Sequence, residues 1–216
     1  MILRYALACL ILISSHVMAI EEPRYELVLA QEDFQLRRYS PMLIAQVTVS
    51  GDLSTASNRG FRQVADYIFG ANEDPIKKEA QKIAMTAPVV IEDVSSKIAM
   101  TAPVIVQTER SPEQSSKEAL WKLAFVMPRQ FTLENLPRPK NPNIEIQKLA
   151  EREVAVVTFS GWVSEADYQK QTERLRTWIQ QQGWRTAGEP QLSRYNPPWT
   201  LPFWRRNEVW LPITRQ

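Results

Sequence analysis

The residue types that support most nucleophilic and metal chemistry lie at the start of this 216-residue chain. Its single cysteine is Cys9 and its single histidine is His16. Residues 20–216 therefore provide no disulfide, zinc-thiolate site, cysteine nucleophile or Ser-His-Asp triad. They also provide no histidine or cysteine thiolate for a haem iron. What remains is carboxylate or tyrosine chemistry, binding of hard metals by carboxylates, or binding without a covalent step.

The first nineteen residues predict a secretory signal peptide. Arg4 precedes an almost wholly apolar run from Tyr5 to Ile13, and Ala19 ends a Val-Met-Ala segment typical of a cleavage site. Because the run is too short to span a bilayer, we expect cleavage after Ala19 and a mature domain of residues 20–216. The expected location is periplasmic or extracellular, without stable membrane anchoring after cleavage. An uncleaved N-terminal membrane anchor is the alternative.

The overall composition is that of a folded globular protein. Hydrophobic residues make up 44% and charged residues 23%, which disfavours a disordered chain and a multi-span membrane protein. The net charge is only +2, and no stretch concentrates Lys and Arg. We therefore expect no nucleic-acid partner, since such binding needs a basic stripe. Nothing in the sequence indicates an oligomeric state.

One group of candidate ligand contacts is the apolar stripe of a helix expected from Ser54 to Phe69. The stripe either packs against a sheet or forms the wall of a groove for a flat ring. At roughly 25 cal/mol per Å2, burying a few hundred Å2 of such a ring contributes several kcal/mol without an iron ligand. The stripe consists of Phe61, Val64, Ala65 and Ile68.

Two methionines occupy identical octapeptides, Lys82 to Val89 and Lys97 to Val104. Met85 and Met100 could offer thioethers to a haem iron, but a histidine normally lies opposite such a ligand. Adaptable packing within a strand is the alternative role for both residues.

Charged and aromatic residues near the C-terminus form a second group of candidates. Arg205 and Arg206 could bind ligand carboxylates, as could Arg38 further upstream, or they could pair with acids of the protein. Glu208 could pair with Arg206, since alternate residues of a strand share one face. Trp199 belongs to an aromatic stretch that could close over a ligand or seal one end of the fold. The other aromatic residues of that stretch are Tyr195, Phe203 and Trp204.

Strands and two helices must position these residues. A second helix is expected from Ser164 to Gly183, with Tyr168, Thr172, Leu175 and Ile179 facing inward and a capping box at its start. Pro88, inside an expected strand, predicts an edge or a bulge. Strands are expected at Tyr25 to Leu29, Phe34 to Tyr39, Met42 to Ser50, Ile83 to Ile91, Ile98 to Thr108, Trp121 to Met127, Ile144 to Leu149, Glu153 to Ser160, Trp184 to Ala187, Gln191 to Tyr195 and Glu208 to Ile213.

The two halves of the chain share a faint similarity. Thr48 to Gly51 matches Thr158 to Gly161, and at the same spacing Ala45 meets Ala155. In both places a strand is followed by Ser-Gly and then by a helix. This predicts an α+β domain with two halves related by a pseudo-twofold axis, in which neither half has a sufficient core of its own.

Several of these segments resemble the SOUL haem-binding protein family, over roughly Tyr25 to Pro212. The resemblance implies an antiparallel, distorted β-barrel of two pseudo-twofold related halves, each with one long helix, similar to the effector-binding domains of drug-sensing regulators. It also implies that haem or another tetrapyrrole binds in an apolar groove along the first helix, and no catalytic residues carry over. The matching segments are Phe34-Gln-Leu-Arg-Arg-Tyr39, the two octapeptides, Glu165-Ala-Asp-Tyr168 with Leu175-Arg176, Tyr195-Asn-Pro-Pro198 and Arg205-Arg-Asn-Glu-Val209.

The chain departs from the family pattern at the polar contacts. Arg38 stands where some members have a histidine. Asn58, Asp66 and Thr200 stand where members offer basic partners for the haem propionates. We therefore expect a non-enzymatic protein that holds a small hydrophobic ligand, haem or a tetrapyrrole, without histidine or cysteine ligation.

Two alternative functions follow from the same residues. The first is a pocket for another hydrophobic or cationic small molecule, with Glu208 attracting the cation. The second is a small-molecule hydrolase that uses Glu208 together with Tyr195.

Overall fold

The computed structural model describes residues 20–94, 119–197 and 199–215. The expected signal peptide, Met100 and the expected strand Ile98 to Thr108 lie outside these residues. The helices are α1 (Leu53–Ile68), α2 (Glu165–Gln181) and the short 3-10 helix η1 (Pro202–Trp204). The strands are β1 (Tyr25–Gln31), β2 (Phe34–Tyr39), β3 (Met42–Ser50), β4 (Asn72–Glu73), β5 (Val89–Asp93), β6 (Leu120–Val126), β7 (Arg138–Pro139), β8 (Glu145–Leu149), β9 (Arg152–Phe159), β10 (Arg185–Thr186), β11 (Gln191–Arg194) and β12 (Asn207–Thr214).

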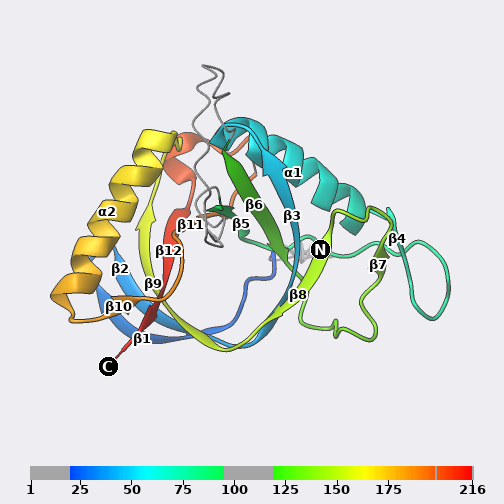
Figure 1. The fold of residues 1–216 in the computed structure, drawn as a ribbon, viewed down its shortest axis with the longest axis horizontal. Coiled ribbons are helices and arrows are strands. Elements are labelled where there is room, and N and C mark those ends of the chain that lie inside the picture. Colours follow the sequence, from blue (N-terminus) through cyan, green and yellow to red (C-terminus); the bar gives the residue numbers. More distant parts are fainter. Residues whose placement is uncertain (1–19, 95–118, 198, 216) are drawn as a thin grey trace, which may run out of the picture.

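The main sheet is antiparallel and, within the described residues, contains ten strands. Its order is β1-β2-β9-β12-β11-β5-β6-β3-β8, and β10 pairs with β12. Figure 1 shows that the sheet curls into a half-barrel, with α1 and α2 against its outer side. Strands β4 and β7 form a separate small pair. The expected fold class, α+β with a barrel-like antiparallel sheet and two long helices, is confirmed.

The sheet contains two equivalent runs of four strands, one that starts at β2 and one that starts at β8. From β2 the order is β2-β9-β12-β11, and from β8 it is β8-β3-β6-β5. The series β2, β3, α1, β5, β6 thus corresponds to β8, β9, α2, β11, β12. The first strand of each series pairs with the other series, β2 with β9 and β8 with β3. Because of this exchange, neither half completes its own sheet.

The two helices begin at strong caps and pack on opposite arms of the sheet. The Asp52 carboxylate accepts from the backbone N–H groups of Ser54 and Thr55, both at 2.9 Å, and so starts α1. Ser164 and Asp167 form the expected capping box of α2. The expected inward residues of α2 are all buried, which confirms the helical pattern: Tyr168, Thr172, Leu175 and Ile179.

Alternating side chains give the sheet two distinct cores. On β3, Ala45 and Val47 face the helices, whereas Ile44 belongs to the core of the inner face. The inner core also contains Tyr39 and Trp210, whose rings lie 4.7 Å apart. A ligand can therefore approach the sheet from two chemically different sides.

The predicted first residue of one strand is wrong. The strand expected from Ile83 begins only at Val89, and β5 lies in the middle of the sheet between β11 and β6. Pro88 therefore lies just before the strand, and neither the edge nor the bulge expected from it exists. Proline has no N–H for a strand ladder, so a central strand can start only after it.

Candidate functional site

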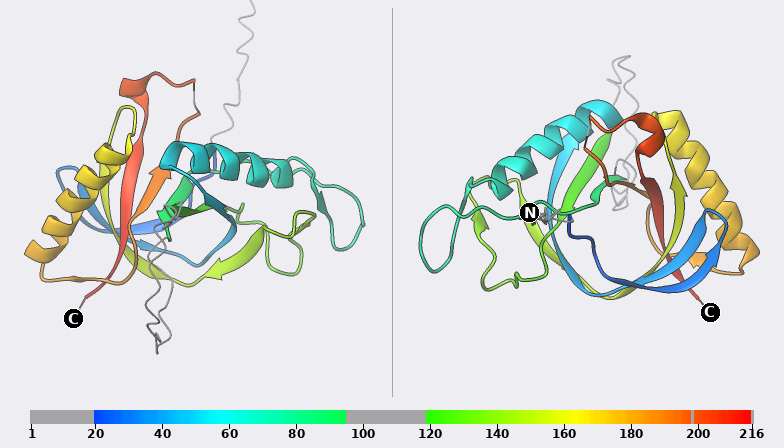
Figure 2. Two further views of the ribbon diagram at one scale, coloured as in Figure 1. Left: turned by 45° about the horizontal axis from the view of Figure 1, so that its top comes forward. Right: turned by 180° about the vertical axis from the view of Figure 1, so that it is seen from behind.

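A groove lies between the N-terminal ends of α1 and α2, on the outer side of the sheet. Its volume is about 460 Å3, within the range of about 300–1,000 Å3 typical of small-molecule sites. Leu53, Phe61 and Leu123 supply apolar surface from α1 and β6. The rim comes from two loops, residues 161–165 and residues 194–207, which Figure 2 shows meeting beside the helix ends. We call this cavity the helix groove.

The helix groove combines an apolar wall with the starts of both helices. The Phe61 ring is half-buried and lies 5.3 Å from the ring of Phe125 in the core below. Asp52 and Ser164, which cap α1 and α2, both line the groove. The starts of both helices are thus already capped by side chains of the protein.

Two arginines occupy the same rim of the helix groove. The Arg194 side chain makes no hydrogen bond or ion pair with any residue that the structure describes, and its Nε is buried without a partner. Burial lowers the pKa of the Arg194 guanidinium, and the positive charge of Arg205 lowers it further. Arg205 lies 3.8 Å above the Trp162 ring and donates from Nε to the Thr200 carbonyl at 2.8 Å. An anion bound at this rim would meet the positive charges of both arginines.

The structure brings some predicted ligand contacts together and separates others. Phe61 and Arg205 both line the helix groove. Val64, Ala65 and Ile68 are buried in the core beneath α1, so their stripe packs against the sheet. The remaining predicted contacts lie outside the groove. Met85 and Trp199 are on the surface, and Arg38 forms ion pairs with Glu26 and Glu153. Arg206 and Glu208 lie beside the inner core, and Met100 is outside the described residues.

The sequence prediction missed Arg194, the most isolated charge of the groove. It ends the short strand β11 directly before the aromatic loop. A lone arginine after a strand gives no sign of having no partner, because that depends on which acids the fold brings near. The one signal in the sequence is that residues 190–207 contain no aspartate or glutamate, so no acid close in the chain can pair with it.

Glu208 lies on the other side of the sheet, in a buried polar cluster. Its side chain is 1% exposed and accepts two hydrogen bonds from the Arg37 guanidinium, at 2.9 and 3.0 Å. The Tyr195 hydroxyl donates to it at 2.7 Å and the Trp210 indole N–H at 2.6 Å. The pair of Glu208 with Arg206 that the sequence predicted is present, with Arg206 Nε 3.8 Å from Glu208 Oε1, but Arg37 is the closer partner. The cluster is therefore saturated with hydrogen bonds.

Two buried tyrosines contact the ion pair: Tyr195 donates to Glu208, and the Tyr39 hydroxyl accepts from Arg37 Nη1 at 3.0 Å. Burial raises the pKa of Tyr39 and of Tyr195 above the usual range, and for Tyr195 the negative charge of Glu208 adds to the effect. Both phenols therefore stay protonated at neutral pH.

Within residues 20–94, 119–197 and 199–215, no group of three His, Cys, Asp or Glu side chains is arranged to hold a metal ion.

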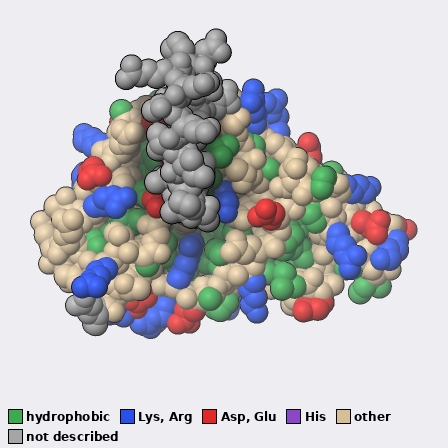
Figure 3. All heavy atoms as spheres, viewed as in Figure 1, with side chains coloured by type: hydrophobic (Ala, Val, Ile, Leu, Met, Phe, Trp, Pro, Cys, Tyr) green, Lys and Arg blue, Asp and Glu red, His purple; other side chains and the backbone are tan. Residues whose placement is uncertain are grey.

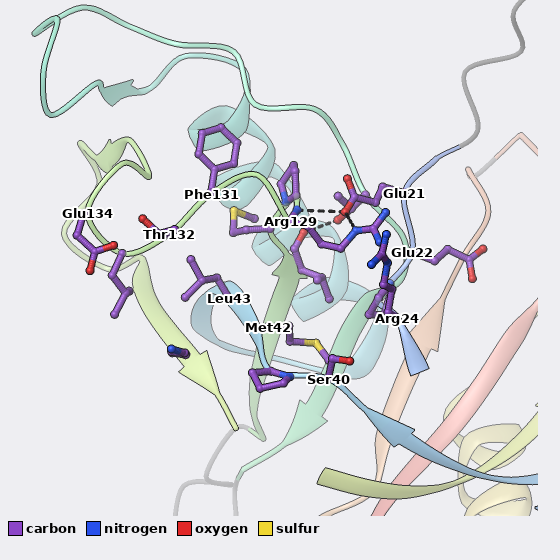
Figure 4. Close-up of a pocket in the computed structure, with 18 residues that line it drawn as sticks. Glu21, Glu22, Arg24, Ser40, Met42, Leu43, Arg129, Phe131, Thr132 and Glu134 are labelled. Atoms are coloured by element: carbon purple, nitrogen blue, oxygen red, sulfur yellow. Dashed lines mark hydrogen bonds and ion pairs between the residues drawn. The ribbon is translucent and has the colours of Figure 1, made fainter. Parts of the chain in front are cut away.

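A second groove, of about 490 Å3, lies near the first described residues and is drawn in Figure 4. Met42, Leu43 and Phe131 supply apolar walls. At one end Glu21 accepts a hydrogen bond from Arg129 Nε at 2.7 Å, so this pair of charges is already balanced. The helix groove is the stronger candidate because it holds a buried arginine nitrogen, Arg194 Nε, that has no hydrogen-bond partner among the described residues.

Charged side chains of both signs are mixed on the surface. On the face seen in Figure 3, Lys and Arg side chains are interspersed with Asp and Glu. Across the part of the chain that the structure describes, no helix combines the length and apolar character needed to cross a membrane.

Comparison with known families gives a match across most of the chain. Residues 20–96 and 91–212 match the family described as SOUL heme-binding protein. Pig Heme-binding protein 1 is 33% identical over 90 residues, which cover 42% of this chain and 47% of the pig protein. The chain thus spans about half the length of that relative. Human Heme-binding protein 2 is 29% identical, covering 82% of this chain and 77% of its own.

Solved structures show the same fold at low sequence identity. The C-terminal domain of EcmrR aligns with a TM-score of 0.56 at 12% identity, covering 89% of this chain and 99% of that domain. A hydrolase from Listeria innocua aligns with a TM-score of 0.53, also at 12% identity, covering 87% of this chain and 94% of its own. These similarities concern the fold alone.

The buried pair gives a prediction about stability. Replacing Arg37 by methionine leaves the Glu208 charge buried without its partner, so we expect the free energy of unfolding to fall by about 3–5 kcal/mol. The matched change Arg38→Met removes ion pairs that water screens and should cost much less. Urea unfolding of both variants measures the difference. Equal losses in the two variants would contradict a dominant role for the buried pair.

Proposed function

This chain belongs to the SOUL haem-binding protein family, and on that premise we propose that it binds haem or a related tetrapyrrole in the helix groove. The groove offers apolar surface on one side and two guanidinium groups on its rim. Haem supplies a flat apolar macrocycle, an iron atom and two propionates at one edge. The match in shape and charge supports binding with the propionates toward Arg194 and Arg205.

The observation that carries this proposal is the lack of a partner for Arg194. A buried Nε without a hydrogen-bond acceptor is costly, and a ligand carboxylate would remove that cost. The carboxylates of the groove do not remove it. Asp52 already accepts hydrogen bonds from Ser54 and Thr55, and Glu165 lies exposed at the start of α2.

The described walls of the helix groove offer no usual axial ligand for a haem iron. Among the described residues that line it, none is a histidine, cysteine, methionine or tyrosine. Affinity would then come from burial of the macrocycle faces and from the arginines. Phe61 presents its ring as part of the apolar wall.

Binding, rather than catalysis or attraction of a cation, is the role that these residues support. Glu208 is shielded from solvent and already paired with Arg37, so it offers no net charge to a cationic ligand. The same shielding makes Glu208 and Tyr195 a poor pair for hydrolysis. We therefore propose a non-enzymatic binding protein.

We further propose that the protein acts in the periplasm or outside the cell, after cleavage following Ala19. The support is the apolar run and the cleavage-site pattern of the first nineteen residues. The mass of the protein recovered from its native compartment should correspond to a chain that begins at Ile20. A mass that includes residues 1–19 would favour the N-terminal anchor instead.

Replacing Arg194 by glutamine tests the propionate contact. Loss of one charge-assisted hydrogen bond is worth about 1.5–3 kcal/mol, so we expect haem affinity to fall by about ten- to a hundredfold in an absorbance titration. Arg62→Gln, on the exposed side of α1, is the matched control and should bind like the parent chain.

Esterified haem separates the charge contact from a change in groove shape. With the dimethyl ester, which lacks propionate charges, the parent chain and Arg194→Gln should bind equally. Equal haem affinity of these two chains, with charged propionates present, would show that Arg194 does not hold them.

Metal-free protoporphyrin tests the absence of an axial ligand. Because no described wall residue of the groove is a usual iron ligand, we expect protoporphyrin to bind within a few fold of haem. Fluorescence quenching of the protein measures both affinities. If haem binds about a hundredfold or more tightly than protoporphyrin, an iron ligand must come from elsewhere in the chain.

A further inference from the structure

We propose that an exposed aromatic surface beside the helix groove docks reversibly onto an anionic lipid bilayer. The surface is formed by the loop between β9 and α2 and by the loop between β11 and β12. We call it the aromatic end. It consists of Trp162, Trp199, Leu201, Phe203 and Trp204.

The side chains of the aromatic end are open to solvent to an unusual degree. Trp199 is 83% exposed, Trp204 70% and Trp162 67%. Phe203 is 64% exposed and Leu201 49%. Soluble proteins seldom gather large apolar side chains on their surface without a partner. Burial of these rings would be a substantial driving force for association.

The exposed rings stand on an ordered framework. The Gly161 N–H donates to the Pro202 carbonyl at 2.9 Å, and Asn207 Nδ2 donates to the Gly161 carbonyl at 3.1 Å, so the two loops are joined. The Phe203 and Trp204 rings contact each other edge-on at 5.0 Å. Little conformational entropy is therefore lost when this surface docks.

Charge and residue type favour a lipid surface over a protein partner. Residues 158–164 and 190–207, which contain the two loops, include three arginines and no aspartate or glutamate. One of these, Arg206, pairs with Glu22 at 2.5 Å, whereas Arg194 meets no described acid. Tryptophan together with arginine is typical of the membrane–water interface, where the ring lies among headgroups and the cation meets anionic lipid.

The position of the aromatic end suits a flat surface. Figure 2 shows the loop with η1 projecting beyond the N-terminal ends of α1 and α2. Trp162 and Arg205 line the helix groove as well as this end of the molecule. Docking would therefore bring the groove to the bilayer, where amphipathic tetrapyrroles dissolve; this last step rests on the proposed function.

The test is partitioning of the full chain, without haem, onto vesicles of phosphatidylcholine with about 30% phosphatidylglycerol. We expect the double substitution Trp199→Ser, Trp204→Ser to weaken partitioning by at least about tenfold, because two large rings no longer enter the interface. The matched control, Ile76→Ser with Leu133→Ser, removes exposed apolar side chains elsewhere and should leave partitioning unchanged. Residues 1–19 are the same in all three chains, so differences between them report the substituted positions.

Brominated lipids provide a second measurement. They should quench tryptophan fluorescence in the parent chain and the control, and much less in the double variant. Equal partitioning and quenching in all three chains would overturn the proposal. So would a dimer in sedimentation that the double substitution abolishes, since the rings would then cover a second copy.

The outcome is independent of the proposed ligand. Vesicle binding without haem tests the aromatic end alone, and the haem titration of Arg194→Gln in vesicle-free buffer tests the groove alone. If one of these experiments contradicts its proposal, the other proposal is unaffected.

Discussion

The ion pair between Arg37 and Glu208 is the constraint on which the inner side of the sheet depends. Each group is buried, and each would be costly to bury alone. Their mutual attraction, with hydrogen bonds from Tyr195 and Trp210, makes this charge tolerable inside the half-barrel. The pair also joins β2 to β12, across the intervening β9. Neither charge of this pair is left free to meet a ligand.

The outer side acquires its groove from the symmetry of the strand order. Strands β3 and β9 occupy equivalent places, and each leads directly into a helix. Both helices consequently begin at one end of the molecule, where Asp52 and Ser164 cap them. The loop after β11 closes the remaining side and contributes Arg205. Two ordinary helix starts and one irregular loop are thus enough to create a concave surface.

Local patterns in the sequence predicted most elements, because strand alternation and helix caps depend on near neighbours. The bounds of β2 and β3 were predicted as the structure has them, and those of α2 to within a residue or two. Partners across the sheet could not be predicted. Arg37 and Glu208 are 171 residues apart, and only the exchange of strands brings them together. The isolation of Arg194 is likewise a property of the assembled fold.

The central place of β12 in the sheet has a consequence for folding during synthesis. Strand β12 lies inside the sheet between β9 and β11, although it follows all the other described strands along the chain. Until β12 has been synthesised, β9 and β11 lack the strand that lies between them. Contacts between distant segments also form slowly. The sheet can therefore close only once β12 is available, and a chain truncated before Asn207 would expose open strand edges to aggregation.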